Sequence, residues 1–139
     1  MTIQKISNPI VREWFLSAQD DELLVEQTLK ENKNYPPNPL CFLAQQIAEK
    51  SLKGFLVFIK QEVPKLHQIE KLLAMCAKTD PDFLEFDETG KWLSELYITT
   101  RYPADGAFKA FSRAEAKEAF EKAQKIKNFV MDKIHQDKI

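Results

Sequence analysis

Apolar residues recur every three or four positions along most of the 139-residue chain, which is the spacing of one buried helix face. The first such segment begins after Asn8-Pro9 and ends in the polar loop ENKNYPPNP. The second segment, at about residues 39–61, is the most apolar in the chain and is closed by Pro64. Its apolar residues cover more than one face, which predicts a helix packed by several neighbours.

Three shorter or more amphipathic segments follow. Apolar residues at 66–76 indicate a third helix, residues 81–100 hold a turn and a fourth helix, and residues 116–130 carry the apolar stripe of a last helix. No segment alternates with period two for long enough to predict a strand. We therefore predict an all-α, up-and-down bundle of four to five helices, forming one domain over residues 1–139.

Four of the predicted helix starts carry capping signals. In three of them an N-cap residue precedes a proline, whose missing N–H has no partner to lose in the first turn. These starts are Asn8-Pro9, Asn38-Pro39 and Asp80-Pro81. At the fourth start, Ser112 and Glu115 have the spacing of a capping box.

The composition is that of a folded globular protein, with 44% hydrophobic and 29% charged residues. Lys and Arg number 20 against 21 Asp and Glu, which gives a formal net charge of -1. Overall charge therefore does not predict nucleic-acid binding, and only a local basic patch remains open.

The chain shows no sign of membrane insertion or export. Its N-terminus lacks the apolar core of a signal peptide, and its longest apolar run, GFLVFI, is far too short to span a bilayer. Cys41 and Cys76 both lie in apolar helical patterns, so we expect buried free thiols rather than a disulfide or a metal site. We expect a cytoplasmic protein without a metal or a cofactor.

The segment AQQIAEKSLKGFL carries the strongest local pattern. Gln45, Glu49 and Lys53 fall four residues apart, and Lys50 lies on an adjacent line. The simplest interpretation is an exposed polar stripe whose Glu49–Lys53 pair contributes about 0.3–0.5 kcal/mol. The alternative is a row of donors that lines a groove.

A second group of polar residues marks a corner within LYITTRYPADGAFKAF. Pro103 ends the helix, so Arg101 and Tyr102 fall where the chain turns. In a structural role, Arg101 donates to the exposed carbonyls at the helix end and Tyr102 packs on the bundle. In a binding role, Arg101 holds a phosphate and Tyr102 stacks on a base. The sequence leaves both interpretations open.

Four pieces of the sequence, in this order, resemble a HEPN domain: YPP, FLAQQIAEKSLKGFL, LHQIEKLL and LYITTRYPADG. Each piece is short, but their order and spacing cover about residues 10–134. The resemblance implies a bundle of four or five helices that is commonly dimeric. It also implies a gene pair with a minimal nucleotidyltransferase in a toxin–antitoxin-like system.

Many HEPN proteins are metal-independent ribonucleases whose motif is an arginine, four to six residues and a histidine. Arg101 matches the arginine, but no histidine follows at that spacing. Asp105 lies in the right region, but an exposed turn gives no cause for the large pKa shift that would let it replace imidazole. His67 and His135 lie elsewhere in the chain, and an isolated imidazole such as His67 is more often a cap or packing residue. We therefore predict that the usual HEPN ribonuclease activity is absent.

Three functions remain as hypotheses. The first is a dimeric binding or regulatory module for a nucleotide or an RNA phosphate, which docks a nucleotidyltransferase partner. The second is a ribonuclease toxin with a rearranged site around Arg101, and the third is a purely structural interaction protein. The candidate ligand-binding residues are Arg101, Tyr102, Asp105, Glu49, Lys50, Lys53, Gln45 and His67, and no catalytic residue is assigned.

Overall fold

The computed structural model describes every residue except 1, 32, 102, 104–105, 107 and 137–139. The described residues form helices and connections without any strand, which confirms the predicted all-α class. The elements, with η for a 3-10 helix, are η1 (Ile3–Lys5), α1 (Pro9–Glu31), α2 (Pro37–Phe58), α3 (Ile69–Ala77), η2 (Pro81–Phe86), α4 (Asp87–Ser94), α5 (Leu96–Thr99) and α6 (Arg113–Gln136). Glu95 alone separates α4 from α5 and has helical φ and ψ, so the two form one nearly continuous helix.

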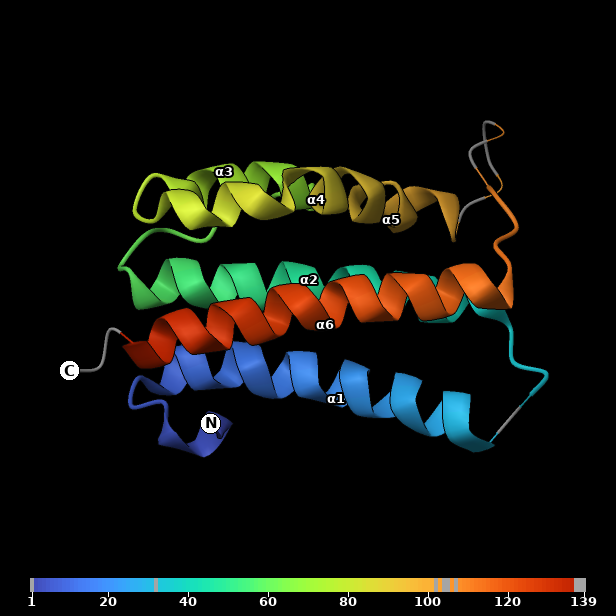
Figure 1. The fold of residues 1–139 in the computed structure, drawn as a ribbon, viewed down its shortest axis with the longest axis horizontal. Helices are drawn as coiled ribbons and strands as arrows, with labels where there is room; N and C mark the ends of the chain where they lie inside the picture. Colours follow the sequence, from blue (N-terminus) through green and yellow to red (C-terminus); the bar gives the residue numbers. More distant parts are fainter. Residues whose placement is uncertain (1, 32, 102, 104–105, 107, 137–139) are drawn as a thin grey trace.

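The helices run up and down in three levels (Figure 1). The long helices α2 and α6 lie side by side in the middle, with α1 on one side and the shorter helices α3, α4 and α5 on the other. Helices α1, α2, α4–α5 and α6 alternate in direction along the chain, as predicted for an up-and-down bundle, so α2 and α6 run in the same direction.

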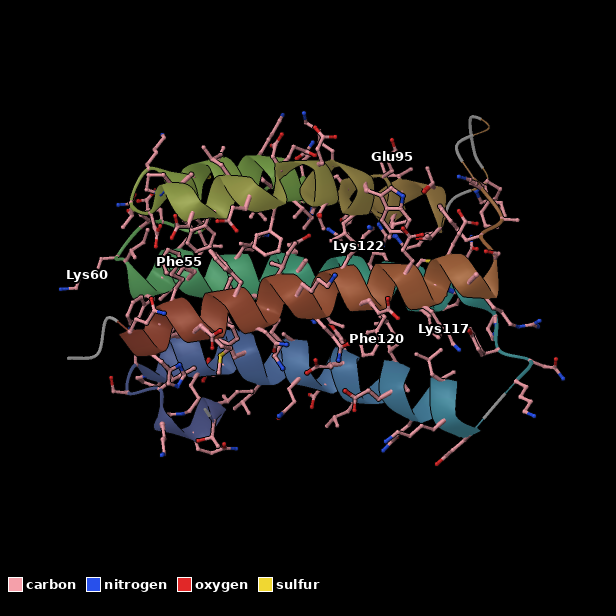
Figure 2. All side chains as sticks on the ribbon, in the orientation of Figure 1. Phe55, Lys60, Glu95, Lys117, Phe120 and Lys122 are labelled. Atoms are coloured by element: carbon pink, nitrogen blue, oxygen red, sulfur yellow. The ribbon has the colours of Figure 1, made fainter. Side chains whose placement is uncertain are left out.

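The central position of α2 explains its composition. It packs most extensively against α6 and α1 and also contacts α3, so it has neighbours on several sides. Phe55, for example, is buried between α2 and the outer level, where its ring centroid lies 4.6 Å from that of Phe83 (Figure 2). The prediction that this helix buries more than one face is confirmed.

Three of the four predicted capping signals are confirmed. The Asn8 side chain accepts hydrogen bonds from the N–H groups of Ile10 and Val11 at 2.9 and 3.3 Å. The Asp80 side chain caps η2, where it accepts from the N–H of Asp82 at 3.1 Å. Ser112 and Glu115 form the reciprocal capping box, with both side chain–backbone bonds at 3.0 Å.

The predicted start at Asn38-Pro39 is wrong. Helix α2 already begins at Pro37, so Asn38 lies inside its first turn. The Asn38 side chain instead bonds three backbone groups far along the chain: its amide donates to the carbonyls of Thr100 and Lys109, and its oxygen accepts from the N–H of Phe111. The Asn38 side chain therefore bonds to distant backbone groups instead of capping the start of its own helix.

Helix α2 also ends earlier than predicted, at Phe58 rather than near residue 61. Lys60 has a positive φ of 62°, and the N–H groups of Lys60 and Gln61 donate back to the carbonyls of Val57 and Leu56. This is a Schellman C-cap with lysine in place of the usual glycine. The turn, rather than Pro64, ends the helix, and Lys60 projects from the end of the bundle (Figure 2).

Both cysteines are buried and unpaired, as predicted. Burial raises the pKa of each thiol to about 12, so neither Cys41 nor Cys76 forms a reactive thiolate at neutral pH. In the part of the chain that the structure describes, no helix is both long enough and apolar enough to cross a membrane, and no three potential metal ligands gather.

Candidate functional site

The carboxylate of Glu49, on α2, lies at the centre of a buried polar cluster. One oxygen accepts from the Gln45 side-chain amide at 3.0 Å and lies 3.1 Å from Nδ1 of His67, and the other accepts from the Lys53 ammonium at 3.0 Å. Gln46 extends the cluster, since its amide donates to the Gln45 side-chain oxygen at 2.7 Å.

The interpretation of this segment as an exposed polar stripe is wrong. The relative exposures of Gln45, Glu49 and Lys53 are 0%, 5% and 6%. The connection between α2 and α3 covers this face, and the Gln45 amide holds it by donating to the backbone carbonyl of His67 at 2.9 Å. Sequence spacing correctly grouped these side chains on one line but did not show that another part of the chain covers them.

Opposing effects act on the ionisation of Glu49. Burial favours the neutral acid, but hydrogen bonds from Gln45 and Lys53, the charge of Lys53 and the contact with His67 outweigh it, so the pKa of Glu49 is lowered. An ionised carboxylate only accepts hydrogen bonds, so Nδ1 of His67 carries the proton. In the neutral imidazole, Nε2 is then the nitrogen with the lone pair.

Tyr97, on α5, connects this cluster to the corner. Its ring stacks on the His67 imidazole with centroids 4.0 Å apart and an interplanar angle of 12°. The Tyr97 hydroxyl lies 3.1 Å from Nε2 of His67. Because the rings are nearly parallel, the hydroxyl lies over the imidazole face rather than along its lone pair, so stacking is the main contact.

Arg101 rests on the same aromatic group. Its guanidinium carbon lies 4.4 Å from the Tyr97 ring centroid and 4.2 Å from that of Phe42, and its Nε donates to the Tyr97 carbonyl at 2.9 Å. The structural role predicted for Arg101, donation to a carbonyl at the helix end, is therefore confirmed. The same contacts hold its planar cation in a fixed orientation.

Asn38 fixes the backbone on either side of this corner. Its three hydrogen bonds join the first turn of α2 to Thr100, Lys109 and Phe111. The N–H of Lys109 also donates to the carbonyl of Thr99 at 2.8 Å. These hydrogen bonds hold residues 99–100 and 109–111 together, and Arg101 follows directly after the first of these two segments.

The structure brings together five of the eight candidate site residues and separates one. Glu49, Gln45, Lys53 and His67 form the buried cluster, and Tyr97 links it to Arg101. Lys50 lies outside the cluster, since its ammonium pairs with Asp21 of α1 at 2.7 Å. Tyr102 and Asp105 lie outside the described residues.

Two residues of this site, Phe42 and Tyr97, were not among the candidates that the sequence analysis singled out. The spacing of Tyr97 and Arg101, four residues apart, was an available signal for a helical side-chain pair. No comparable signal pointed to Phe42, which reaches Arg101 from another helix.

A surface groove of about 350 Å³ adjoins the exposed side of the His67–Tyr97 stack. It is lined by His67, Gln68, Ser94, Glu95, Tyr97, Ile98 and Thr99. The side chain of Ile98 is exposed, and Glu95 lies on the outer surface of the bundle (Figure 2). The groove thus offers an aromatic and apolar surface, while the nearby guanidinium offers a positive charge.

Replacing Glu49 by Gln tests whether its charge is the basis of the cluster. The change leaves the Lys53 ammonium buried without its carboxylate, so we expect the free energy of unfolding to fall by about 3–5 kcal/mol at neutral pH. Because the folded-state pKa is lowered, the contribution of Glu49 is complete above its ordinary pKa of 4.5 and is lost as the pH falls through the folded-state value. Urea unfolding followed by circular dichroism should therefore show a shallower acid loss for E49Q than for wild type.

The matched control is Asp80→Asn. A hydrogen bond from Lys133 lowers the pKa of Asp80 as well, but this pair lies at the surface. D80N should change stability at neutral pH by no more than about 1 kcal/mol. Equal losses for E49Q and D80N would contradict a central role for Glu49.

Comparison with known proteins places this architecture in a family. The model of the HEPN domain matches residues 11–134. No curated protein matches the chain.

Two solved structures share the fold. TT1696 from Thermus thermophilus is 34% identical over 88% of this chain and 97% of its own, with a TM-score of 0.70. ST0689, described as an archaeal HEPN homologue, is 26% identical over 89% of this chain and 97% of its own, with a TM-score of 0.69. The chain belongs to the HEPN domain family.

Proposed function

We propose that this protein is a binding module for a phosphate-bearing ligand, a nucleotide or an RNA segment, at the surface formed by Arg101, Tyr97 and His67. The observation that carries the proposal is the guanidinium of Arg101, which is held on the rings of Phe42 and Tyr97, the second of which also lines the groove. A preorganised planar cation suits a phosphate, because little conformational entropy is lost when the ligand binds.

The groove supports the same ligand class. A base can stack on the exposed part of the Tyr97–His67 pair or pack on Ile98, since every base has an apolar face. The carboxylate of Glu95 repels phosphate from the groove itself, which favours the phosphate at Arg101 and the base in the groove.

The proposal includes two protein partners. Other HEPN domains are commonly dimeric and paired with a minimal nucleotidyltransferase in toxin–antitoxin-like systems, and we extend both properties to this cytoplasmic module. Among the described residues, seven large apolar side chains are exposed, and four of them lie on α1: Ile10, Leu16, Leu23 and Leu24. These four side chains support the outer side of α1 as the dimer face.

Arg101→Ala tests the binding site. Titration of labelled ATP, GTP and a short RNA should show about ten- to hundredfold weaker binding, because a charge-assisted hydrogen bond contributes about 1.5–3 kcal/mol. Arg113→Ala is the matched control. Arg113 also donates through Nε to a carbonyl, that of Tyr35, and lies over the Tyr35 ring, but on a different part of the bundle.

Binding in R113A should equal that of wild type. Equal affinity of R101A and wild type for these ligands, or equal losses of affinity in R101A and R113A, would contradict the proposed binding site. Circular dichroism of each variant separates these outcomes from unfolding.

Leu24→Glu tests the dimer face. A charge placed in an apolar interface is costly to desolvate, so we expect at least about tenfold weaker dimerisation in light scattering after size exclusion. Leu84→Glu introduces the same change at an equally exposed leucine of η2 and should leave the dimer intact. A monomeric wild type, or a dimeric L24E, would contradict this part of the proposal.

A second function, metal-independent RNA cleavage, is favoured by one specific observation. The Glu49 carboxylate contacts Nδ1 of His67, an arrangement that orients an imidazole for proton transfer, and 44% of the His67 side chain is exposed. His67 accepts the proton of a ribose 2′-hydroxyl as this oxygen attacks phosphorus. The bond to the 5′-oxygen breaks, and water protonates the leaving oxygen.

His67→Asn distinguishes cleavage from binding. If the protein cleaves a mixed RNA pool in EDTA, H67N should lower the rate about a hundredfold or more, because the general base is lost. His135→Asn, at the other histidine of the chain, should cleave at the wild-type rate. No cleavage by wild type, or equal rates for H67N and wild type, would reject the enzyme and leave the binding proposal unaffected.

A further inference from the structure

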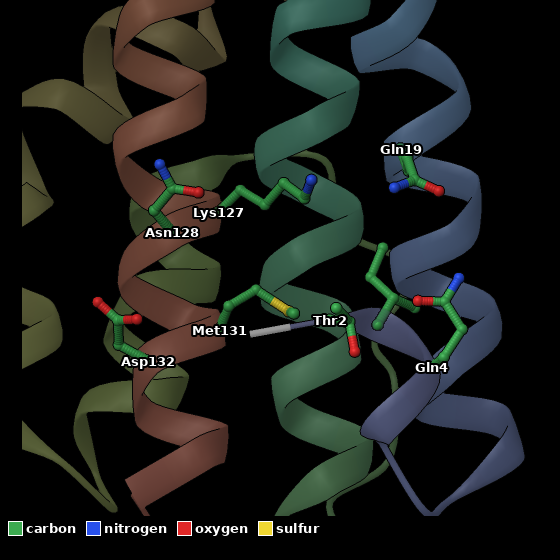
Figure 3. Close-up of a pocket in the computed structure, with 8 residues that line it drawn as sticks. Thr2, Gln4, Gln19, Lys127, Asn128, Met131 and Asp132 are labelled. Carbon is green, nitrogen blue, oxygen red and sulfur yellow. The ribbon is translucent and has the colours of Figure 1, made fainter.

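A polar hollow of about 310 Å³ lies between η1, α1 and α6, at the end of the bundle where the described chain begins and away from the corner after α5 (Figures 1 and 3). It is lined by Thr2, Ile3, Gln4, Gln19, Lys127, Asn128, Met131 and Asp132. Its volume is at the lower end of the range for ligand pockets, about 300–1,000 Å³, so it suits a small ligand.

A buried cation forms part of its wall. Lys127 is only 8% exposed, and its side chain extends from α6 toward α1, where Gln19 lies (Figure 3). Its ammonium pairs with Glu22 of α1, and the Glu22 carboxylate also accepts from the Gln124 amide at 3.2 Å. Glu22 is the one hydrogen-bond acceptor for this ammonium among the described residues.

An ammonium has three donors, so the pairing with Glu22 leaves two Lys127 donors for other oxygen atoms, and Lys127 is among the residues that line the hollow. A buried donor without an acceptor is costly, which requires oxygen atoms from water or from a ligand at this position.

Neutral donors and acceptors surround the rest of the hollow. The side-chain amides of Gln4, Gln19 and Asn128 and the hydroxyl of Thr2 line it, and within the described part of the chain none of them makes a side-chain hydrogen bond to the protein. The Asp132 carboxylate adds a further acceptor. This wall can therefore both donate to and accept from the same ligand.

Charge and shape narrow the ligand class. Glu22 already neutralises Lys127, and Asp132 adds a negative charge, so an anionic ligand is disfavoured. A hydroxyl group donates to a carboxylate or an amide oxygen and accepts from an ammonium or an amide N–H. The apolar side chains of Ile3 and Met131 provide a surface for the C–H groups of a sugar ring.

We propose that this hollow is a second binding site, separate from the Arg101 surface, for a neutral ligand that carries a vicinal diol. A free sugar and the ribose of a nucleoside both supply this chemistry. The site requires neither the proposed phosphate site nor the proposed ribonuclease.

The test is a titration of the full chain with ribose, adenosine and 2′,3′-dideoxyadenosine, followed by NMR at the Gln19 side-chain amide and the Met131 methyl group. Saturable shifts with ribose would identify the free sugar as sufficient, and shifts with adenosine alone would identify the nucleoside. In either case dideoxyadenosine, which lacks the diol, should bind at least about fivefold more weakly, because two hydroxyl contacts are lost.

Gln19→Ala supplies the matched variant. It should weaken binding about fivefold or more, since it removes one neutral hydrogen bond from the site. Gln27→Ala, at an exposed position of the same helix, should bind as wild type does. R101A should also bind as wild type does.

Three results would overturn the proposal: no saturable shift with ribose or adenosine, equal affinity for adenosine and its dideoxy analogue, or equal affinity in Q19A and wild type. Because R101A leaves this hollow intact, failure here is distinguishable from failure of the phosphate site.

Discussion

The arrangement of the site depends on a carboxylate that is nearly removed from water. Taking the charge of Glu49 out of solvent is unfavourable unless hydrogen bonds and an opposite charge replace its hydration. Gln45 and Lys53 supply these from the same helix, and His67 supplies a third contact from the connection that covers them. The requirement to satisfy one ionised group therefore determines where the connection between α2 and α3 lies.

Aromatic stacking connects the buried Glu49 carboxylate to residues at the molecular surface. His67 is held by Glu49, Tyr97 stacks on His67, and Arg101 lies on Tyr97, so a buried charge and a half-buried cation belong to one continuous set of contacts. The helix–helix packing of α2, α3 and α5 and the polar cluster support each other. A set of side chains linked in this way is rigid, because His67, Tyr97 and Arg101 are each held by a neighbouring side chain.

Much of the fold was predictable from local patterns. Helical spacing of apolar residues, together with the caps at Asn8, Asp80 and Ser112, identified the helices and most of their starts. These signals concern residues within a few positions of one another. Asn38 shows where such reasoning fails, because its hydrogen-bond partners lie more than 60 residues away. Nothing in the neighbouring sequence distinguishes an asparagine that bonds distant backbone groups from one that caps a helix.

The candidate site was predictable as a set of residues but not as an arrangement. Sequence spacing grouped Gln45, Glu49 and Lys53, yet burial depends on the connection that folds over them, and an exposed stripe has the same spacing. His67 and Arg101 were singled out separately, and only the folded chain joins them through Tyr97. Lys50, one residue from Glu49, faces α1 because neighbouring helix positions point about 100° apart.

The three hydrogen bonds of Asn38 also affect which changes in the connection between α5 and α6 the fold can tolerate. Because hydrogen bonds join Thr99 to Lys109 and Asn38 to Lys109, the connection that follows Arg101 can be lengthened without repacking any helix. The entropy of loop closure rises by only about 0.6 kcal/mol for each doubling of length. The helices can therefore keep their packing while the sequence of this one connection changes.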